Sequence, residues 1–179
     1  NNRLQIVTVG GDFVRAIGSS GSGNVEFNCP DGVAVLEDGN LVVCDYQNHR
    51  LQIVTVGGLF VRTIGSEGSG NLQFKCPCGV AVLKDGNLVV CESSNHRLQI
   101  VTVGGKFVRT IGGEGPGNLQ FHDPRGVAVL EDGNLVVVVV CEIDRLQIVT
   151  VGGRFVRTIG SAGSGIRFEQ QPAADRDCD

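Results

Sequence analysis

The sequence predicts an all-β fold built from repeated four-stranded antiparallel sheets. RLQIVTVGG begins at Arg3, Arg50, Arg97 and Arg145, and each copy is followed, after one variable residue, by FVRTIG or FVRAIG. The copies lie 47, 47 and 48 residues apart, which is the spacing of repeat architectures. Each unit contains several short runs of strand-forming residues bounded by turn residues. These observations together predict a tandem array of small β-sheets.

Four strands are expected in each unit, from the runs GVAVL, LVVC, RLQIVTV and FVRTIG. Val, Ile, Leu, Phe and Thr in these runs favour a pleated, packed surface. The Asp–Gly pairs at 38–39, 85–86 and 132–133 predict tight two-residue hairpins between the first and second strands. Gly–Gly pairs, such as 57–58, predict the same between the third and fourth strands. The other two connections are longer.

The nearly continuous apolar runs indicate sheets that are covered on both faces. Four antiparallel strands in a unit of this length are typical of a β-propeller blade. This topology places the tight hairpins on one rim and the long connections on the opposite rim. We expect an open or partial propeller over residues 1–168, with a half blade at 2–18, blades at 30–65, 77–112 and 124–160, and an irregular tail at 169–179.

An incomplete ring has a predictable cost. An open arc leaves apolar sheet faces bare at both ends, and such faces are normally capped, covered or paired. We therefore expect the chain to self-associate through its open blade faces. Because it begins within a repeat and contains no methionine, we also expect it to be a piece of a longer protein.

The composition restricts the classes of partner. The net charge of −4 argues against the extended basic surface that phosphate binding requires. The longest apolar run, Leu135 to Cys141, is shorter than a membrane span, so no membrane is expected. Cys44, Cys91 and Cys141 lie beside valines, as reduced thiols in a core would. A reducing compartment is favoured, and we expect the cytoplasm.

PDGVAVLEDGNLVVCDYQNHRLQ at 30–52 and PCGVAVLKDGNLVVCESSNHRLQ at 77–99 closely resemble the NHL repeat. This resemblance implies six-bladed propellers, which often select substrates in ubiquitin-ligase proteins that carry a separate RING module. No RING pattern is present in the sequence. The third unit departs from the pattern with IDR at 143–145 and one inserted residue in LVVVVVCEI, which predicts a bulge or register adjustment. No GVAV run follows Phe168.

Residues that recur in each unit are interpreted as structural. His49 and His96 hold the same offset, so we expect each to make the same local hydrogen bonds rather than to bind zinc. Acids recur near the end of the second strand as Asp45, Glu92 and Glu142, and we expect them to anchor the long connection. Cys76 and Cys78 lack the second ligand pair of a zinc site. We predict no cofactor.

Residues that differ between units are candidates for ligand recognition, because loops vary while a scaffold holds them in place. Drift in tolerant loops is the alternative. Tyr46 and Arg125 are the residue types that most often anchor interfaces. The candidate binding residues, all expected on the long-connection rim, are Asn28, Asp31, Tyr46, Gln47, Lys75, Cys78, Ser93, Ser94, His122, Asp123 and Arg125.

The sequence therefore favours a non-catalytic module, not an enzyme, that binds protein or peptide ligands. RNA binding is a less favoured alternative, because Asp31 and Asp123 offset Lys75 and Arg125 and only one tyrosine accompanies them. A zinc-dependent lyase that releases amidated peptides is a weaker alternative by resemblance. It would need histidines that converge on the axis, and only His122 breaks the repeat symmetry.

Overall fold

A computed structural model describes residues 1–139 and 145–160. The predicted tail at 169–179 and the candidate structural residues Cys141 and Glu142 lie outside the described residues. The first blade consists of β5 (Pro30–Val35), β6 (Leu41–Asp45), β7 (Arg50–Val54) and β8 (Phe60–Ile64). The second consists of β11 (Pro77–Val82), β12 (Leu88–Glu92), β13 (Arg97–Val101) and β14 (Phe107–Ile111), and the third of β17 (Pro124–Val129), β18 (Leu135–Val139), β19 (Arg145–Val149) and β20 (Phe155–Ile159).

The remaining elements lead into the blades or lie between their strands. A two-stranded half blade precedes them, with β1 (Leu4–Val7) and β2 (Phe13–Ile17). Short 3-10 turns connect the second and third strands as η1 (Tyr46–Asn48) and η2 (Ser93–Asn95). The connections that lead into the blades contain β3 (Ser19–Ser20) with β4 (Glu26–Phe27), β9 (Ser66–Glu67) with β10 (Gln73–Phe74), and β15 (Gly113–Glu114) with β16 (Gln120–Phe121).

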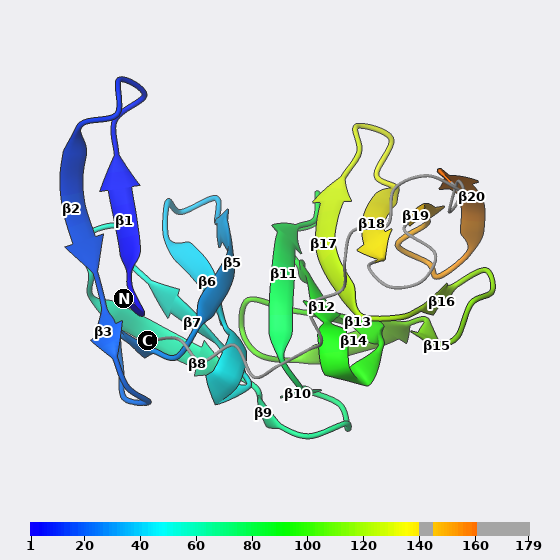
Figure 1. Cartoon of the computed structure of the whole chain (residues 1–179), viewed down its shortest axis with the longest axis horizontal. Helices are drawn as coiled ribbons and strands as arrows, with labels where there is room; N and C mark the ends of the chain where they lie inside the picture. The colour runs from blue at the N-terminus through cyan, green and yellow to red at the C-terminus, as the bar shows by residue number, and fades with distance from the viewer. Residues whose placement is uncertain (140–144, 161–179) are drawn as a thin grey trace, which may run out of the picture.

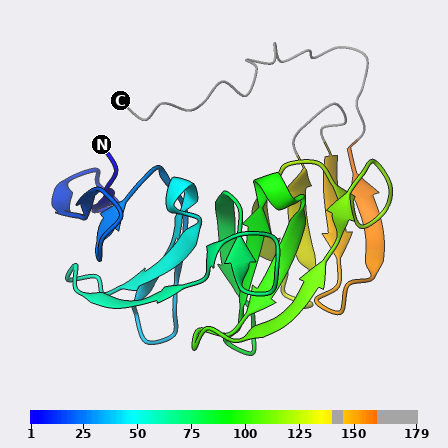
Figure 2. The ribbon, with the colours of Figure 1, turned by 90° about the horizontal axis from the view of Figure 1, so that it is seen from below.

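The predicted all-β fold of four-stranded antiparallel sheets is confirmed. Each blade has its strands in sequence order, as in β5-β6-β7-β8. The sheets follow one another in chain order along an arc (Figures 1 and 2). β11 contacts β5 on one side and β17 on the other, so the first strand of each blade is the innermost. The chain therefore forms part of a propeller.

The hairpins are tight, but each includes one residue more than the two that were predicted. Leu36 and Asn40 close the first hairpin, with Leu36 N donating to Asn40 O at 2.8 Å. Gly39 N donates to Leu36 O, and Gly39 has φ +81°, which glycine adopts at little cost. Asp38 Oδ1 accepts from Asn40 N at 2.9 Å. The result is a three-residue loop with its glycine in the left-handed conformation.

Each connection that leads into a blade contains a short pair of parallel strands, which was not predicted. β9 pairs with β10 through Ser66 with Gln73 and Glu67 with Phe74. Phe74 is fully buried, and a Cβ on Gly65 would lie 2.3 Å from its ring. The glycine therefore lets the backbone cross the ring closely.

The core lies between successive blades. One cluster joins Leu51 and Cys44 of the first blade to Val80, Leu88 and other residues of the second. Dispersion and the removal of apolar surface from water both favour such contacts. Stability therefore depends on each blade having a neighbour, as in other repeat proteins.

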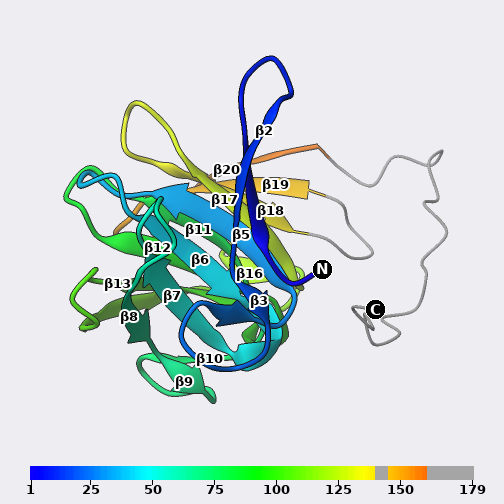
Figure 3. The ribbon, with the colours of Figure 1, turned by 90° about the vertical axis from the view of Figure 1, so that its left-hand side faces the viewer.

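Within residues 1–139 and 145–160, the two ends of the array lack a neighbouring blade. At the C-terminal end, Ile159 is 42% exposed, whereas the equivalent Ile111 is 2% exposed. At the N-terminal end, Val33 is 51% exposed, whereas the equivalent Val80 is 8% exposed. Figure 3 looks at this N-terminal end. The arc is therefore open, as the repeat count predicts.

The third blade differs from the prediction in register. β18 pairs with β19 without a shift, from Leu135 opposite Val149 to Val139 opposite Arg145. Asp45 pairs with Arg50 at the equivalent place in the first blade, so Val139 takes the position that we expected Glu142 to hold. No bulge interrupts the described residues of this pair. The inserted residue falls within 140–144, outside the described residues.

Candidate functional site

The long-connection rim is held by a buried carboxylate in the first blade. Asp45, at the end of β6, is fully buried. Its carboxylate accepts hydrogen bonds from Asn28 N at 2.7 Å and from Asn48 Nδ2 at 2.9 Å. It also accepts from Arg50 Nε at 2.8 Å and from Gln52 Nε2 at 3.1 Å. The acid therefore receives enough donors to offset its desolvation.

The same side chains fasten the preceding connection to the blade. Arg50 Nη2 donates to the carbonyl oxygens of Gly23, at 2.8 Å, and Glu26, at 3.1 Å. Gln52 Nε2 donates to Glu26 O at 2.6 Å, and Gln52 Oε1 accepts from Val25 N at 3.0 Å. The loop backbone thus uses side chains in place of sheet partners. The role of this glutamine was not predicted, although a glutamine recurs at this place in every copy of RLQIV.

The second blade repeats the arrangement with a longer acid. Glu92 is fully buried and accepts from Lys75 N at 3.3 Å and Arg97 Nε at 2.9 Å. Asn95 Nδ2 and Gln99 Nε2 donate to the same carboxylate. The predicted anchoring role of the acids is confirmed for Asp45 and Glu92.

The recurring histidines join each blade to the next connection. His49 Nδ1 accepts from Cys76 N at 3.1 Å, and His96 Nδ1 accepts from Asp123 N at 3.2 Å. In both bonds the donating N–H lies 27 residues after the histidine in the sequence. Asn2 Oδ1 accepts from Cys29 N with the same separation. The expectation that these histidines make the same structural hydrogen bond in each blade is confirmed.

We expect His49→Ala to lower the free energy of unfolding by about 1–3 kcal/mol, because the partly buried Cys76 N–H would lose its acceptor. His49→Asn should cost much less, since Asn2 makes the same bond to Cys29. Urea unfolding monitored by circular dichroism measures both. Equal losses for the two variants would contradict the assigned role of Nδ1.

Several unlike side chains meet on the rim next to these anchors. Tyr46 opens η1, and burial raises the pKa of its hydroxyl, which lies close to Ser93, Cys76 and Arg125. We call these four residues with Asp123 the rim cluster. Arg125 Nη2 and Nε both donate to Asp123 Oδ2, at 2.8 and 3.1 Å. The cluster therefore joins residues from all three blades or their connections.

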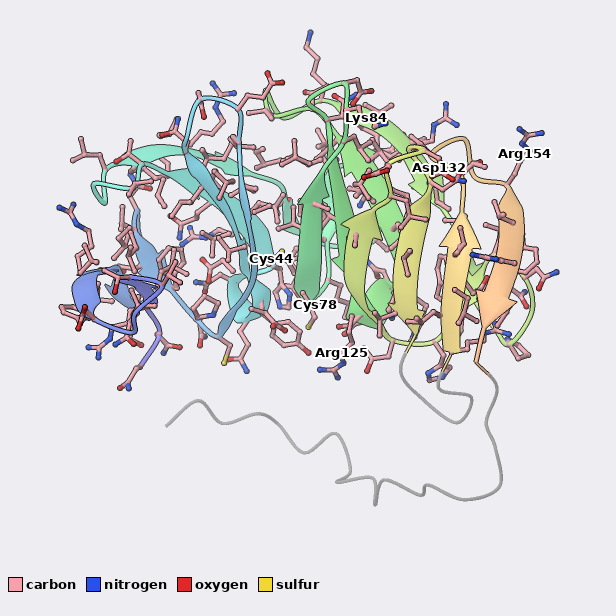
Figure 4. The ribbon with its side chains drawn as sticks, turned by 90° about the horizontal axis from the view of Figure 1, so that it is seen from above. Cys44, Cys78, Lys84, Arg125, Asp132 and Arg154 are labelled. Atoms are coloured by element: carbon pink, nitrogen blue, oxygen red, sulfur yellow. The ribbon has the colours of Figure 1, made fainter. Side chains whose placement is uncertain are left out.

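Three equivalent positions near the innermost strands carry different chemistry. Asp31, Cys78 and Arg125 lie 47 residues apart, on β5, β11 and β17. Cys78 Sγ donates to Pro124 O at 3.2 Å, and both Asp31 and Arg125 are near enough to influence its pKa. The rim therefore changes from acidic to neutral to basic across adjacent blades. In Figure 4, Cys78 and Arg125 lie at the end of the sheets opposite Lys84 and Asp132.

The structure places the predicted binding residues at different depths. Cys78 and Ser93 are each 3% exposed, so they support the surface from beneath rather than face a ligand. The partly buried residues are Asn28, Tyr46, Asp123 and Arg125, and the exposed ones are Asp31, Gln47, Lys75, Ser94 and His122. His122 packs against His96, with ring centroids 5.0 Å apart. Within the described residues, no three His, Cys, Asp or Glu side chains form a group suited to a metal ion.

Burial makes Cys78 a weak acid. Desolvation, with the charges of Asp31 and Asp123, raises its pKa to about 12, although Arg125 acts in the opposite direction. Burial also raises the pKa of Cys44 and of Cys91 well above the usual range. All three are free thiols.

We expect the free energy of unfolding to fall as pH rises above 9. The unfolded thiol ionises near its ordinary pKa of 9.0, whereas folded Cys78 stays protonated to about 12. The stability is thus fully present below pH 9 and is lost between pH 9 and 12, at up to about 1.4 kcal/mol per pH unit for each such thiol. Urea titrations at pH 8, 9 and 10 should show a smaller slope for Cys78→Ala. An unchanged slope would contradict this assignment.

The described residues contain no helix long and apolar enough to cross a membrane.

Comparisons with known proteins agree with the blade geometry. The fold defines the class: a partial β-propeller. The family model for the NHL repeat matches residues 27–54 and 74–101, from β4 to β7 and from β10 to β13. The chain therefore contains two NHL repeats, at these residues. A search of curated proteins finds no match.

Solved structures share this fold at low identity. A streptogramin B lyase has a TM-score of 0.65 and 18% identity, covering 91% of this chain and 49% of the lyase. A catalytically inactive virginiamycin B lyase from Staphylococcus aureus with quinupristin gives 0.66 and 16%, covering 90% and 50%. A putative gluconolactonase gives 0.65 and 18%, covering 86% and 55%. The chain spans about half the length of these proteins.

These neighbours correct the prediction that the protein is not an enzyme. The lyase and the gluconolactonase carry catalytic names on the same propeller fold. At such identities the likeness shows the fold alone, and that fold is compatible with catalysis. Non-catalytic character therefore does not follow from the blades or from the missing RING pattern.

Proposed function

We propose that the long-connection rim binds a protein or peptide ligand through the rim cluster. The observation that carries the proposal is that Tyr46 and Arg125, from different blades, lie on the same rim near enough for the arginine charge to act on the tyrosine hydroxyl, with buried Ser93 beside them. Tyrosine and arginine supply much of the binding energy at many interfaces. The histidine and carboxylate anchors hold the loops that carry these residues, so little ordering cost remains on binding.

The charges of the rim suggest a ligand with polar groups of both signs. Arg125 is held by Asp123, which leaves part of its guanidinium for a second acceptor. Exposed Asp31 and Lys75 extend the mixed charge to either side. Substrate selection in a ubiquitin-ligase protein is one use of such a surface, and it is supported only by the NHL repeats.

Selection from a peptide library displayed on phage tests the proposal. We expect the purified chain to enrich a sequence class, and Tyr46→Ala and Arg125→Ala to weaken binding of a selected peptide by about tenfold or more each. Lys84→Ala, on the opposite rim, is the matched control and should bind as the unaltered chain does.

No enrichment, or equal loss for the Lys84 variant, would refute this assignment. A library of single-stranded RNA provides the comparison. If RNA is retained and its affinity falls steeply with salt, the rim binds nucleic acid and the peptide proposal is wrong.

A further inference from the structure

The hydrogen bonds of His49 and His96 require neutral imidazoles. His49 Nδ1 accepts from Cys76 N at 3.1 Å, and His96 Nδ1 accepts from Asp123 N at 3.2 Å. A backbone N–H can only donate, so each Nδ1 must be without a proton. A protonated imidazole carries a proton on both ring nitrogens and would place two donors face to face. Because histidine gains its second proton in mild acid, we expect both bonds to be lost between about pH 7 and pH 5.

The two residues that donate these bonds have an unfavourable backbone conformation. Cys76 has φ +53° and Asp123 has φ +52°, in the left-handed region that few residues other than glycine adopt. Such a conformation persists where the surrounding contacts fix it. The bond to histidine is one of these contacts, so its loss allows the connection to change conformation.

The charged groups near the two histidines differ. Glu67 Oε1 lies 3.9 Å from His49 Nε2, but the glutamate side chain is 70% exposed, so it stabilises a protonated His49 only weakly. The rings of His96 and His122 lie 5.0 Å apart, and two imidazolium ions at this distance repel each other. This repulsion favours separation of the second blade from the connection in acid. The neighbouring charged side chains pair with one another: Arg50 with Asp45, Arg97 with Glu92, and Arg125 with Asp123.

We propose that His49 and His96 form a pH-sensitive switch in the rim cluster. Cys76 and Asp123, whose N–H groups they bind, both belong to that cluster, and Asp123 in turn holds Arg125. Protonation of the imidazoles releases Cys76 and Asp123 from their fixed positions. A ligand must then order the cluster when it binds, which lowers its affinity. This last step rests on the proposed function: the rim binds its peptide near neutral pH and releases it in mild acid.

The chain contains a form of the same contact that does not titrate. Asn2 holds the position equivalent to His49 and His96, and its Oδ1 accepts from Cys29 N at 3.0 Å. Cys29 has φ +51°, so the donating residue has the same backbone conformation. Asparagine also tolerates the left-handed conformation that His49 adopts at φ +54°. The double variant His49→Asn, His96→Asn should therefore keep both bonds in mild acid.

Amide hydrogen exchange of the full chain measures the switch without a ligand. Protection factors, which correct for the intrinsic effect of pH on exchange, should fall about tenfold between about pH 7.5 and pH 5.5 at the N–H groups of Cys76 and Asp123. At Cys29 they should stay constant. In the double asparagine variant they should stay constant at all three residues. His122→Asn removes a titrating histidine outside these bonds, and the fall at Cys76 should persist.

Binding of a selected peptide that contains no histidine measures the effect on the proposed function. The Kd should rise about tenfold over the same pH interval, and the double asparagine variant should bind equally at both pH values. Protection of Cys76 and Asp123 that does not change with pH, or that changes equally in the double variant, would overturn the switch. An affinity that is independent of pH in the unaltered chain would do the same. If no peptide is selected, the proposed function fails instead, and the exchange at Cys76 and Asp123 still decides the switch.

Discussion

Replacing Glu92 by alanine is expected to lower the free energy of unfolding by about 3–5 kcal/mol. Glu92 is fully buried, and its carboxylate accepts from Arg97 Nε and Gln99 Nε2. Removing one partner of a buried ion pair leaves the other without compensation, which costs far more than a surface pair contributes. Urea unfolding measures the loss.

The chain supplies its own control for this substitution. Asp45 fills the equivalent place in the first blade and accepts from Arg50 and Gln52 in the same way. Glu92→Asp should therefore retain most of the stability that Glu92→Ala loses. If the aspartate variant is as unstable as the alanine variant, the hydrogen-bonded carboxylate is not the source of the effect.

The second large effect is expected at Gly79, where two blades meet backbone to backbone. A Cβ at this position would lie 2.6 Å from Arg125 O and 3.2 Å from Gly126 Cα. Neither group can move without separating β11 from β17. Gly79→Ala should therefore destabilise the protein by about 3 kcal/mol, at the upper end of the cost of overpacking.

Gly126 is the matched position in the third blade. Among the residues that the structure describes, a Cβ there would meet the Val138 side chain alone, at 3.3 Å, and side chains shift more readily than backbone. Gly126→Ala should change the free energy of unfolding by less than about 1 kcal/mol. Thermal unfolding of both variants measures the difference. Comparable losses would mean that blade-to-blade approach does not explain the glycine at position 79.

Much of the fold was predictable because the same turn, strand and hydrogen-bonding residues recur at fixed positions in each unit. The hairpin glycines, the strand runs and the shared hydrogen bond of His49 and His96 all follow from recurrence at a fixed offset. The carboxylate anchors at Asp45 and Glu92 followed in the same way. Long connections and tight hairpins fell on opposite rims because antiparallel strands in sequence order allow no other placement.

The register of the third blade was not predicted, for a physical reason. A run of valines presents the same side chain at every step, so its sequence does not distinguish one pairing from another. Counting from the turn at Asp132 and Gly133 would have placed Val138 opposite Leu146, as the structure has it. The burial of Cys78 was missed because burial depends on Pro124 of the next blade. Catalytic or non-catalytic character was not predictable, since one fold serves both.

The hydrogen bonds that join residues 27 positions apart in the sequence have a consequence for synthesis on the ribosome. Val25 N–H finds its acceptor in Gln52, and Cys29 N–H finds its acceptor in Asn2, both across 27 residues. Some backbone N–H groups of a connection therefore lack their hydrogen-bond acceptors until the following blade has been translated. At about 5–20 residues per second this delay lasts about 1–5 s for each unit. Nascent chains would pass through a series of such waits, one per blade, during which chaperones have access to the unfinished sheet.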